Sequence, residues 1–288
     1  LKILFSLYPD VVVGKGGFAS FPTLVAARIL NIPVIIHESD TVPGRVNAWA
    51  GKFAKRVAIS FPEASKFFNQ EKIALTGQPV QRELLEPDKN GAFEYLGLEP
   101  SLLTLFITGG SLGSQRMNNE ILDLLPELLM SYQVIHQVGT DNIDIMKQEL
   151  DLRLKDHPHR ERYLMYGFMN ALELKMSAGA STVIISRAGA SSIFNIASWG
   201  VPSIIIPITE SNGNHQRENA YSFTRAGACV VIEEANLHSH VLKSEILRLF
   251  NDGEERLRMS GAARAFFKAG AGRTIADEII RLALEHEK

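Results

Sequence analysis

The sequence predicts a protein of the α/β class, built from parallel strands and the helices that connect them. Short apolar runs alternate with longer amphipathic stretches along the 288 residues, which is the pattern of repeated strand–helix–strand units. Glycine-rich segments directly follow some of these runs, as they do in tight strand-to-helix turns. The tail from His240 onward has helical periodicity, with breaks near Asn251–Gly253 and Ala269–Gly272.

Four strands are expected in the first part of the chain. Their apolar runs are Asp10–Val13, Pro33–His37, Arg56–Ser60 and Ile73–Thr76. One helix is expected to begin with Ser20 as its N-cap and Pro22 in its first turn, and another to lie within Pro43–Phe53. Because four strands are few for a domain of this class, the first domain is predicted to be truncated.

A polar stretch, Gln81–Gly91, has little apolar periodicity and marks the predicted domain boundary. The pattern then restarts with six strands, at Leu103–Thr108, Gln133–Val138, Tyr163–Tyr166, Thr182–Ser186, Ser203–Pro207 and Cys229–Glu233. Six strands with intervening helices describe a complete Rossmann-like domain. The predicted domains are therefore residues 1–85 and 86–268, followed by a C-terminal helix within residues 269–288.

The composition is typical of a cytosolic protein. A net charge of −2 argues against broad nucleic-acid binding, which needs a strongly basic face. Cys229 is the single cysteine, so an internal disulfide is impossible. No apolar run reaches the roughly 18 residues that span a bilayer, and no signal-peptide pattern precedes the first strand. The chain begins at Leu1 rather than methionine, so we expect a fragment or a trimmed product.

Three glycine-rich loops each follow a predicted strand and open a helix. They span residues 14–17, 109–114 and 186–192. Glycine lets the backbone approach a ligand, and the helix that follows offers N–H groups and a partial positive charge to an anion. A single loop of this kind is more typical of a plain tight turn than of a ligand site. Three such loops at the carboxyl ends of strands, where ligands bind in this class, favour a nucleotide-phosphate site centred on residues 186–219.

Better-known fingerprints are missing from the sequence. It has no Gly-x-Gly-x-x-Gly followed by an acidic residue about 20 positions on and no phosphate loop ending in Gly-Lys-Ser/Thr. The eight histidines show no metal-ligand spacing, and no Asp-x-Asp pair is present. Dinucleotide oxidoreductases and NTPases are therefore disfavoured. We expect neither a metal nor a cofactor, and a phosphate grip that depends on N–H groups.

Two polar clusters accompany the loops. His215, Gln216 and Asn219 lie at helical spacing and are predicted to point from a helix end into an inter-domain cleft, although a solvated helix start has the same composition. The cluster His37–Asp40 lies at the carboxyl end of a strand, where a binding site explains polar residues better than packing does. Capping is the alternative for Ser39 and Asp40.

Taken together, these segments resemble the MurG family of glycosyltransferases over roughly Pro9 to Glu233. The matching motifs are Gly14-x-Gly16-Gly17-Phe18-x-Ser20-x-Pro22, His37-Glu38, Gly44-x-x-Asn47, Thr76-Gly77-x-Pro79-Val80, Gly109-Gly110-Ser111-x-Gly113 with Asn118, Ser186-Arg187-Ala188-Gly189-Ala190, Gly200-x-Pro202 and His215-Gln216-x-x-Asn219-Ala220. The resemblance implies a GT-B-type fold, in which two Rossmann-like domains face each other across a cleft. It also implies that the C-terminal helix, within Thr274–Glu287, packs back on the first domain.

The resemblance implies a role for each candidate residue. The diphosphate and ribose of UDP-N-acetylglucosamine are expected at the helix start formed by Ala190, Ser191, Ser192, Ile193, Phe194 and Asn195. Gln216 is expected at the sugar hydroxyls, Ser111 near the phosphates and the Met169 backbone at the uracil. Asp40 and Gln81 align with further donor contacts. The supporting loop residues are Gly16, Gly17, Asn47, Gly109, Gly110, Arg187, Gly189, His215 and Asn219.

Several positions depart from the family pattern. Ser39 and Asp40 replace a Gln-Asn pair, Gln81 replaces an arginine and Leu112 replaces a glutamine. Asn195 stands where the family has an acidic residue that holds the ribose hydroxyls. An amide still forms hydrogen bonds there, but without the charge-assisted strength of a carboxylate.

The resemblance implies an inverting transfer of N-acetylglucosamine to an undecaprenyl-linked muramyl-pentapeptide in peptidoglycan synthesis. The expected general base lies upstream of Leu1, with His37 and Glu38 as the alternatives within the chain. A lipid-linked acceptor implies a peripheral position on the cytoplasmic face of the membrane, where residues 1–8 form either a membrane-facing helix or part of a core helix. Two other hypotheses stay open: a related UDP-sugar transferase with another acceptor, and a non-catalytic or decayed UDP-sugar-binding copy.

Overall fold

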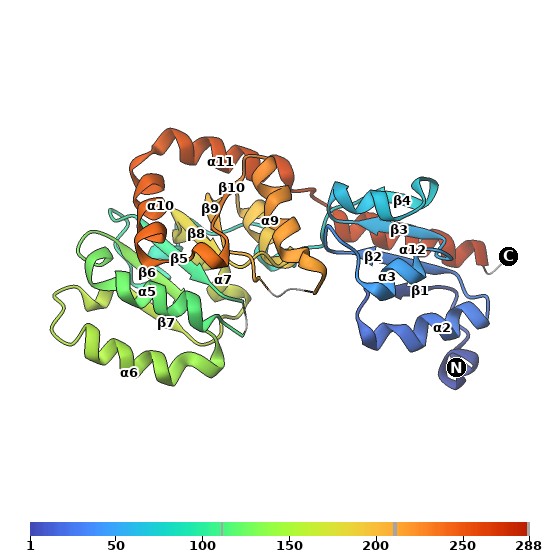
Figure 1. The fold of residues 1–288 in the computed structure, drawn as a ribbon. Coiled ribbons are helices and arrows are strands. Elements are labelled where there is room, and N and C mark those ends of the chain that lie inside the picture. The colour runs from blue at the N-terminus through green and yellow to red at the C-terminus, as the bar shows by residue number, and fades with distance from the viewer. Residues whose placement is uncertain (111, 210–211, 287–288) are drawn as a thin grey trace. The chain divides into compact units, whose positions relative to one another are not determined.

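The chain folds into two compact units, which the computed structural model describes for residues 1–110, 112–209 and 212–286. Unit 1 comprises Leu1–Val80, Glu210–Ser222 and Lys268–Lys288. Unit 2 comprises Gln81–Thr209 and Phe223–Phe267. Each unit contains one parallel sheet, so the predicted α/β class is confirmed (Figure 1).

The sheet of unit 1 has four parallel strands in the order β1-β2-β3-β4. They are β1 (Val12–Gly14), β2 (Val34–Glu38), β3 (Arg56–Ile59) and β4 (Ile73–Leu75). Every residue of β2 is buried, as expected for a parallel strand with both faces covered. Among the α-helices that pack in this unit are α1 (Lys2–Leu7), α2 (Phe21–Ile29), α3 (Arg45–Ala50) and α12 (Ala271–His286).

Opposite faces of this sheet pack against different helices. Leu24 of α2 belongs to the same apolar core as Ile36 of β2. On the other face, Ile35 lines a small cavity of about 280 Å³ together with Ile275 of α12. An ion pair of 2.7 Å between Arg56 Nε and Glu278 Oε1 also joins α12 to the sheet.

Ser20 holds the N-cap position of α2, as expected, but its side chain does not cap the helix. A short 3-10 helix, Phe18–Ser20, runs directly into α2, so Ser20 already has helical backbone angles. Its hydroxyl donates hydrogen bonds to the carbonyls of Gly16 (2.8 Å) and Gly17 (3.0 Å) instead of accepting one from the helix. The proline prediction is correct, because Pro22 lies in the first turn of α2.

The sheet of unit 2 has six parallel strands in the order β10-β9-β8-β5-β6-β7. They are β5 (Thr104–Thr108), β6 (Gln133–Gln137), β7 (Tyr163–Tyr166), β8 (Val183–Ser186), β9 (Ser203–Ile205) and β10 (Cys229–Val231). The chain starts in the middle at β5, builds outward to β7 and then returns to build the other half from β8. The order therefore reverses between β5 and β8, where doubly wound sheets bind ligands, and the predicted Rossmann-like topology is confirmed.

The remaining helices lie mainly in unit 2. They are α4 (Ala92–Leu96), α5 (Gln115–Leu128), α6 (Ile143–Arg153), α7 (Ala171–Ala180), α8 (Ala190–Trp199), α9 (His215–Arg225), α10 (Ser239–Asn251) and α11 (Gly253–Phe266). The residues of α9 up to Ser222 group with unit 1. The units differ here from the predicted domains, which assign residues 210–222 to the second domain and residues 81–85 to the first.

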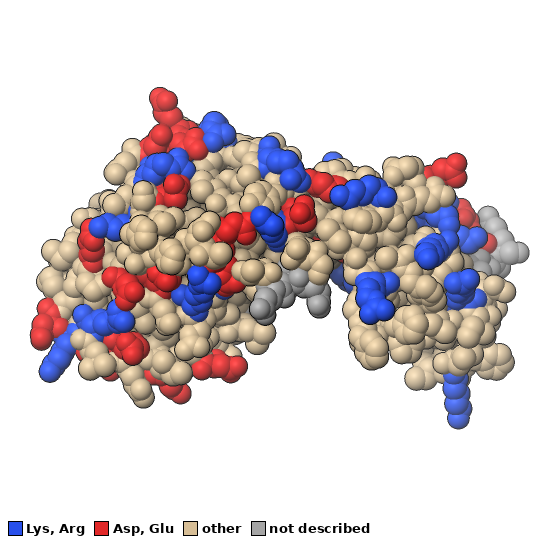
Figure 2. Space-filling view, in the orientation of Figure 1, with Lys and Arg blue, Asp and Glu red and all other residues tan. Residues whose placement is uncertain are grey.

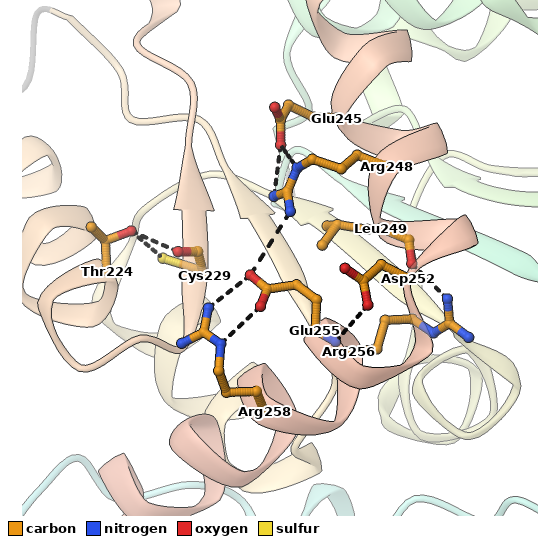
Figure 3. A network of polar contacts seen from close by, with 9 residues as sticks. All are labelled: Thr224, Cys229, Glu245, Arg248, Leu249, Asp252, Glu255, Arg256 and Arg258. Carbon is orange, nitrogen blue, oxygen red and sulfur yellow. Dashed lines mark hydrogen bonds and ion pairs between the residues drawn. The ribbon is translucent and has the colours of Figure 1, made fainter.

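The two predicted breaks in the C-terminal tail are confirmed, and the first has a clear physical cause. Asp252 has extended backbone angles between α10 and α11, and its side chain accepts a 2.9 Å hydrogen bond from the Glu255 N–H (Figure 3). Arg256 donates to the carbonyl of Leu249 at 2.6 Å. The corner thus caps the end of one helix and the start of the next. None of the described helices is long and apolar enough to cross a membrane.

Candidate functional site

The start of helix α8 is open to an approaching anion. Gly189, which precedes the helix, has no side chain to cap the first turn. A Cβ atom built on Gly189 would have the Ser192 Oγ as its nearest neighbour, at 4.0 Å. Because helix N-termini carry unpaired N–H groups and a partial positive charge, this geometry fits the predicted phosphate site.

Arg187 braces the loop that leads into α8. Its side chain is 9% exposed, and its guanidinium donates to Glu234 Oε1 at 2.6 Å and to the Ile206 carbonyl at 3.2 Å. It also donates to the hydroxyl of Ser114, the N-cap of α5. Arg187 therefore links the segments that follow β5, β8, β9 and β10, and its side chain supports the loop from within the protein.

Glu234 completes this brace as a carboxylate. Burial alone would raise its pKa, but hydrogen bonds from the Thr209 N–H (3.0 Å) and from Arg187 hold the pKa below its ordinary range. A carboxyl group whose pKa is lower in the folded protein stabilises the fold fully above its unfolded pKa. That contribution to stability is lost as the pH falls through the pKa that the group has in the folded protein.

We expect Glu234→Gln to reduce the free energy of unfolding at pH 7 by about 2 kcal/mol, because it leaves the buried Arg187 charge uncompensated. Urea denaturation at several pH values measures the effect. The deficit relative to the unmodified protein should shrink below about pH 4.3, the ordinary pKa of glutamate. Glu94→Gln, at an exposed position of α4, is the control. A deficit that stays constant down to pH 3 would contradict the ionic brace.

A pocket of about 290 Å³ lies at the carboxyl edge of the unit 2 sheet. It brings together five residues predicted from the sequence: Gln81, Gly110, Met169, Ser192 and Asn195. It also contains residues that were not predicted, among them Thr108, Gln137, Phe168, Leu174, Ile196 and Trp199. Those residues had no distinguishing sequence signal, because a polar residue ending a strand or an apolar residue in a helix is common in any α/β protein.

Helix α8 contributes one face to this pocket and another to the core. Ser192, Asn195, Ile196 and Trp199 line the pocket at helical spacing. By contrast, Ile193 and Phe194 are not among the residues that line the pocket; both are buried, and Phe194 packs against Phe266 with ring centroids 5.5 Å apart. Of the predicted segment Ala190–Asn195, those two side chains therefore serve packing, and only their backbone is left for a ligand.

The glycine-rich loop after β5 lies directly against the loop after β6. A Cβ on Gly113 would come within 1.9 Å of the Val138 carbonyl oxygen, and one on Gly139 within 2.4 Å of the Leu112 carbonyl oxygen. A Cβ on Gly109 would meet the Gly113 backbone at 2.8 Å. These glycines are therefore required by backbone-to-backbone packing. Ser111, a predicted phosphate contact, lies outside the described residues.

His37 and Glu38 are part of the scaffold of unit 1. Their exposed fractions are 2% and 3%. Burial, with a contribution from the charge of Lys15, lowers the pKa of His37 to about 4, and burial raises the pKa of Glu38. Glu38 accepts hydrogen bonds from the Asp40 N–H (3.0 Å) and from Asn47 Nδ2 (2.8 Å). Because both side chains are enclosed, we do not propose either of them as the general base.

Asn219 also has a supporting role. It is fully buried, its Oδ1 accepts from the N–H and hydroxyl of Thr41 at 2.9 Å each, and its Nδ2 donates to Asp40 Oδ1 at 2.8 Å. The expectation that the Asn219 side chain points into a cleft is therefore wrong: it secures α9 to the loop after β2. His215 and Gln216, one turn earlier, are half-buried.

A second hollow, of about 1060 Å³, belongs to unit 1. Asp40, Gly17 and His215 line it, as do the aromatic residues Phe18, Phe21 and Trp49 and the basic Arg45. Nearby, a Cβ on Gly16 would lie 3.0 Å from Asn47 Nδ2. Because Gly16 has no side chain, its loop can pack closely against Asn47. The Nδ2 group of Asn47 donates a 3.1 Å hydrogen bond to the His37 carbonyl. Within the described part of the chain, no cluster of three or more His, Cys, Asp or Glu residues could hold a metal ion.

Two family models match the chain. Residues 104–274 match the glycosyltransferase family 28 C-terminal domain, and residues 1–59 match the corresponding N-terminal domain. A relative in Thermodesulfovibrio yellowstonii is named UDP-N-acetylglucosamine–N-acetylmuramyl-(pentapeptide) pyrophosphoryl-undecaprenol N-acetylglucosamine transferase. It is 36% identical over 95% of this chain and 74% of its own length. A relative of the same name in Halothermothrix orenii is 32% identical over 95% of this chain and 75% of its own length.

Solved structures agree with the fold. The crystal structure of Acinetobacter baumannii MurG superposes with a TM-score of 0.76 at 25% identity, covering 97% of this chain and 76% of that one. A UDP-N-acetylglucosamine 2-epimerase from Neisseria meningitidis, bound to UDP-N-acetylglucosamine, has a TM-score of 0.71 at 13% identity, covering 97% of this chain and 78% of that one. The second likeness concerns the fold alone.

Proposed function

The chain belongs to the MurG family within glycosyltransferase family 28, and we propose that it transfers N-acetylglucosamine from UDP-N-acetylglucosamine to the undecaprenyl-linked muramyl-pentapeptide. The reaction is a hexosyl transfer in peptidoglycan synthesis. It is an inverting displacement, in which an acceptor hydroxyl attacks the anomeric carbon and UDP departs.

The open start of α8 beside the unit 2 pocket carries this proposal. The diphosphate lies against the N–H groups after Gly189, where the helix stabilises the charge that grows on the leaving group. The nucleoside occupies the 290 Å³ pocket, with the uracil at the Met169 backbone and the ribose near Ser192 and Asn195. Gln81 is a further donor contact in the same pocket.

Unit 1 supplies the remaining proposed contacts. Asp40 and His215 line its larger hollow, and Gln216 lies next to His215 at the start of α9. We propose Gln216 for the sugar hydroxyls and Asp40 for the sugar nucleotide, with Asn219 positioning Asp40 through their 2.8 Å hydrogen bond.

We further propose that unit 1 contacts the cytoplasmic face of the membrane, where a lipid-linked acceptor resides. Phe18, at the hollow, is 88% exposed, and the α1 residues Ile3, Phe5 and Leu7 are between 69% and 72% exposed. Figure 2 shows lysine and arginine side chains spread over the visible face of unit 1. Apolar side chains with basic neighbours suit an anionic lipid surface, and co-sedimentation with phosphatidylglycerol vesicles tests this.

Calorimetry with UDP-N-acetylglucosamine, UDP-glucose and NAD tests the donor proposal. We expect UDP-N-acetylglucosamine to bind most tightly. Preference for UDP-glucose would favour a related transferase with another sugar, a possibility raised by Gln81 and Asn195. Lack of binding to any UDP-sugar would refute a donor site. Donor binding without transfer to a lipid-linked muramyl acceptor would indicate that the protein is a non-catalytic, UDP-sugar-binding copy of the enzyme.

Asn195→Glu is expected to tighten UDP binding by about tenfold. Asn195 is half-buried in the pocket wall, and a carboxylate there accepts charge-assisted hydrogen bonds from the ribose hydroxyls. Calorimetry with UDP and with 2′,3′-dideoxy-UDP measures the gain, which should be confined to UDP. An equal gain with both ligands would show that residue 195 does not face the ribose.

A further inference from the structure

The end of strand β6 places an amide in the wall of the unit 2 pocket. Gln137 is the last residue of β6 and pairs in register with Thr108, the last residue of β5. Both are buried, at 4% and 8% exposure, and both line the pocket. They lie beside the point where the strand order reverses, so they occupy the part of the sheet edge where this fold binds ligands.

Hydrogen bonds orient the Gln137 amide. The Gly110 N–H donates to Thr108 Oγ1 at 3.2 Å, and the Thr108 hydroxyl donates to Gln137 Oε1 at 2.7 Å. The amide oxygen is thereby turned toward Thr108. Among the described residues, Gln137 Nε2 has no hydrogen-bond partner. It is also not completely enclosed by protein, unlike the unpaired side-chain atoms of Asn47, Arg162, Arg187 and Ser203. Gln137 therefore presents hydrogen-bond donors, rather than its acceptor, to an occupant of the pocket.

The other walls fit a flat, largely apolar ring. Leu84, Phe168, Leu174 and Ile196 surround a volume of about 290 Å³, which accommodates a nucleoside but not a complete sugar nucleotide. A pyrimidine base offers apolar faces to such walls and polar groups at its edge. Uracil and cytosine differ at C4, where uracil has a carbonyl acceptor and cytosine an amino donor.

We infer that Gln137 selects uracil over cytosine, because its Nε2 donates a hydrogen bond to the O4 carbonyl of the base. Thr108 is the positioning residue, since its hydroxyl donates to Gln137 Oε1 and accepts from the Gly110 N–H, which favours the orientation in which Nε2 faces the ligand. A cytosine amino group at the same place would meet a second donor and leave both unsatisfied. This inference rests on the proposed binding of a uridine nucleotide in unit 2.

Calorimetry with UDP and CDP tests the inference on the full chain. We expect the unmodified protein to prefer UDP by about tenfold or more, the effect of one buried hydrogen bond. Gln137→Leu should weaken UDP binding by about tenfold, leave CDP binding nearly unchanged and so abolish the preference. Thr108→Val keeps the Gln137 side chain but frees its amide to rotate, so it should lower the UDP-to-CDP ratio with a smaller loss of UDP affinity.

The UDP-to-CDP ratio separates recognition from folding. A merely structural role of Gln137 or Thr108 would lower the melting temperature and weaken UDP and CDP equally. That result, or equal binding of both nucleotides by the unmodified protein, would overturn the inference and leave the proposed function intact. Failure of the unmodified protein to bind either nucleotide would refute the proposed donor site, and the inference with it. If Gln137→Leu does not fold, the ratio measured for Thr108→Val decides alone.

Discussion

Gly189→Val is expected to weaken UDP binding at least about a hundredfold while leaving the fold intact. The residue has φ −63° and ψ 140°, which valine adopts without strain, and the atom nearest to an added Cβ is 4.0 Å away. The new side chain therefore occupies open space, directly in front of the first N–H groups of α8. Loss of two charge-assisted hydrogen bonds, at about 1.5–3 kcal/mol each, accounts for the expected loss of affinity.

Calorimetry with UDP, combined with thermal denaturation, measures both parts of this prediction. Gly261→Val is the matched control, because Gly261 lies in α11, away from the pocket, and an added Cβ there also meets no atom within 4 Å. We expect the control to bind UDP like the unmodified protein. Unchanged UDP affinity in Gly189→Val would show that the diphosphate does not bind at the start of α8.

The strands were predictable because each is encoded locally. Val183, Ile184 and Ile185 of β8, for example, are apolar, β-branched and buried, and such runs fit a parallel strand covered on both faces. The ends of strands were less predictable: β9 stops at Ile205, two residues before the predicted end at Pro207. Proline and the polar loop after it mark the end of a run without specifying where pairing stops.

The direction of polar side chains was not predictable from the chain alone. The spacing of His215, Gln216 and Asn219 places them near one another on a helix, but it does not reveal that Asn219 turns inward to Thr41, 178 positions away in sequence. His37 and Glu38 likewise looked like site residues because they end a strand. Their hydrogen bonds to Ser60 and Asn47 show that they organise the neighbouring loops.

The resemblance to a family located the pocket better than periodicity did. Gln81 is the first residue of unit 2, Met169 lies in a loop and Asn195 in a helix, yet all three line the same pocket. No local pattern connects them, because their proximity follows from the strand order. Gln137 escaped prediction for the complementary reason: one polar residue at the end of an apolar strand is unremarkable until the Thr108 hydroxyl is seen to orient it.

Gly113→Ala is expected to reduce the free energy of unfolding by at least about 3 kcal/mol, the largest effect on stability that we predict. Gly113 has φ +72°, which alone disfavours alanine, and the added Cβ would come within 1.9 Å of the Val138 carbonyl oxygen. Neither atom can move by a side-chain rotation, since one is fixed to the backbone and the other belongs to it. The loops after β5 and β6 would have to separate, which would also disrupt the pocket.

Urea denaturation measures the loss of stability, and UDP binding measures the disruption of the pocket. The variant Gly110→Ala separates the effect of the positive φ from the effect of the contact with Val138. Gly110 has a similar φ of +81°, but an added Cβ there meets no atom within 4 Å, so its cost should be limited to about 1 kcal/mol of backbone strain. The difference between the two variants then measures the contact between the loops. Equal destabilisation by both variants would mean that backbone conformation alone requires Gly113. In that case the close approach to Val138 could not explain the glycine, and the two loops would be free to move independently at the edge of the pocket.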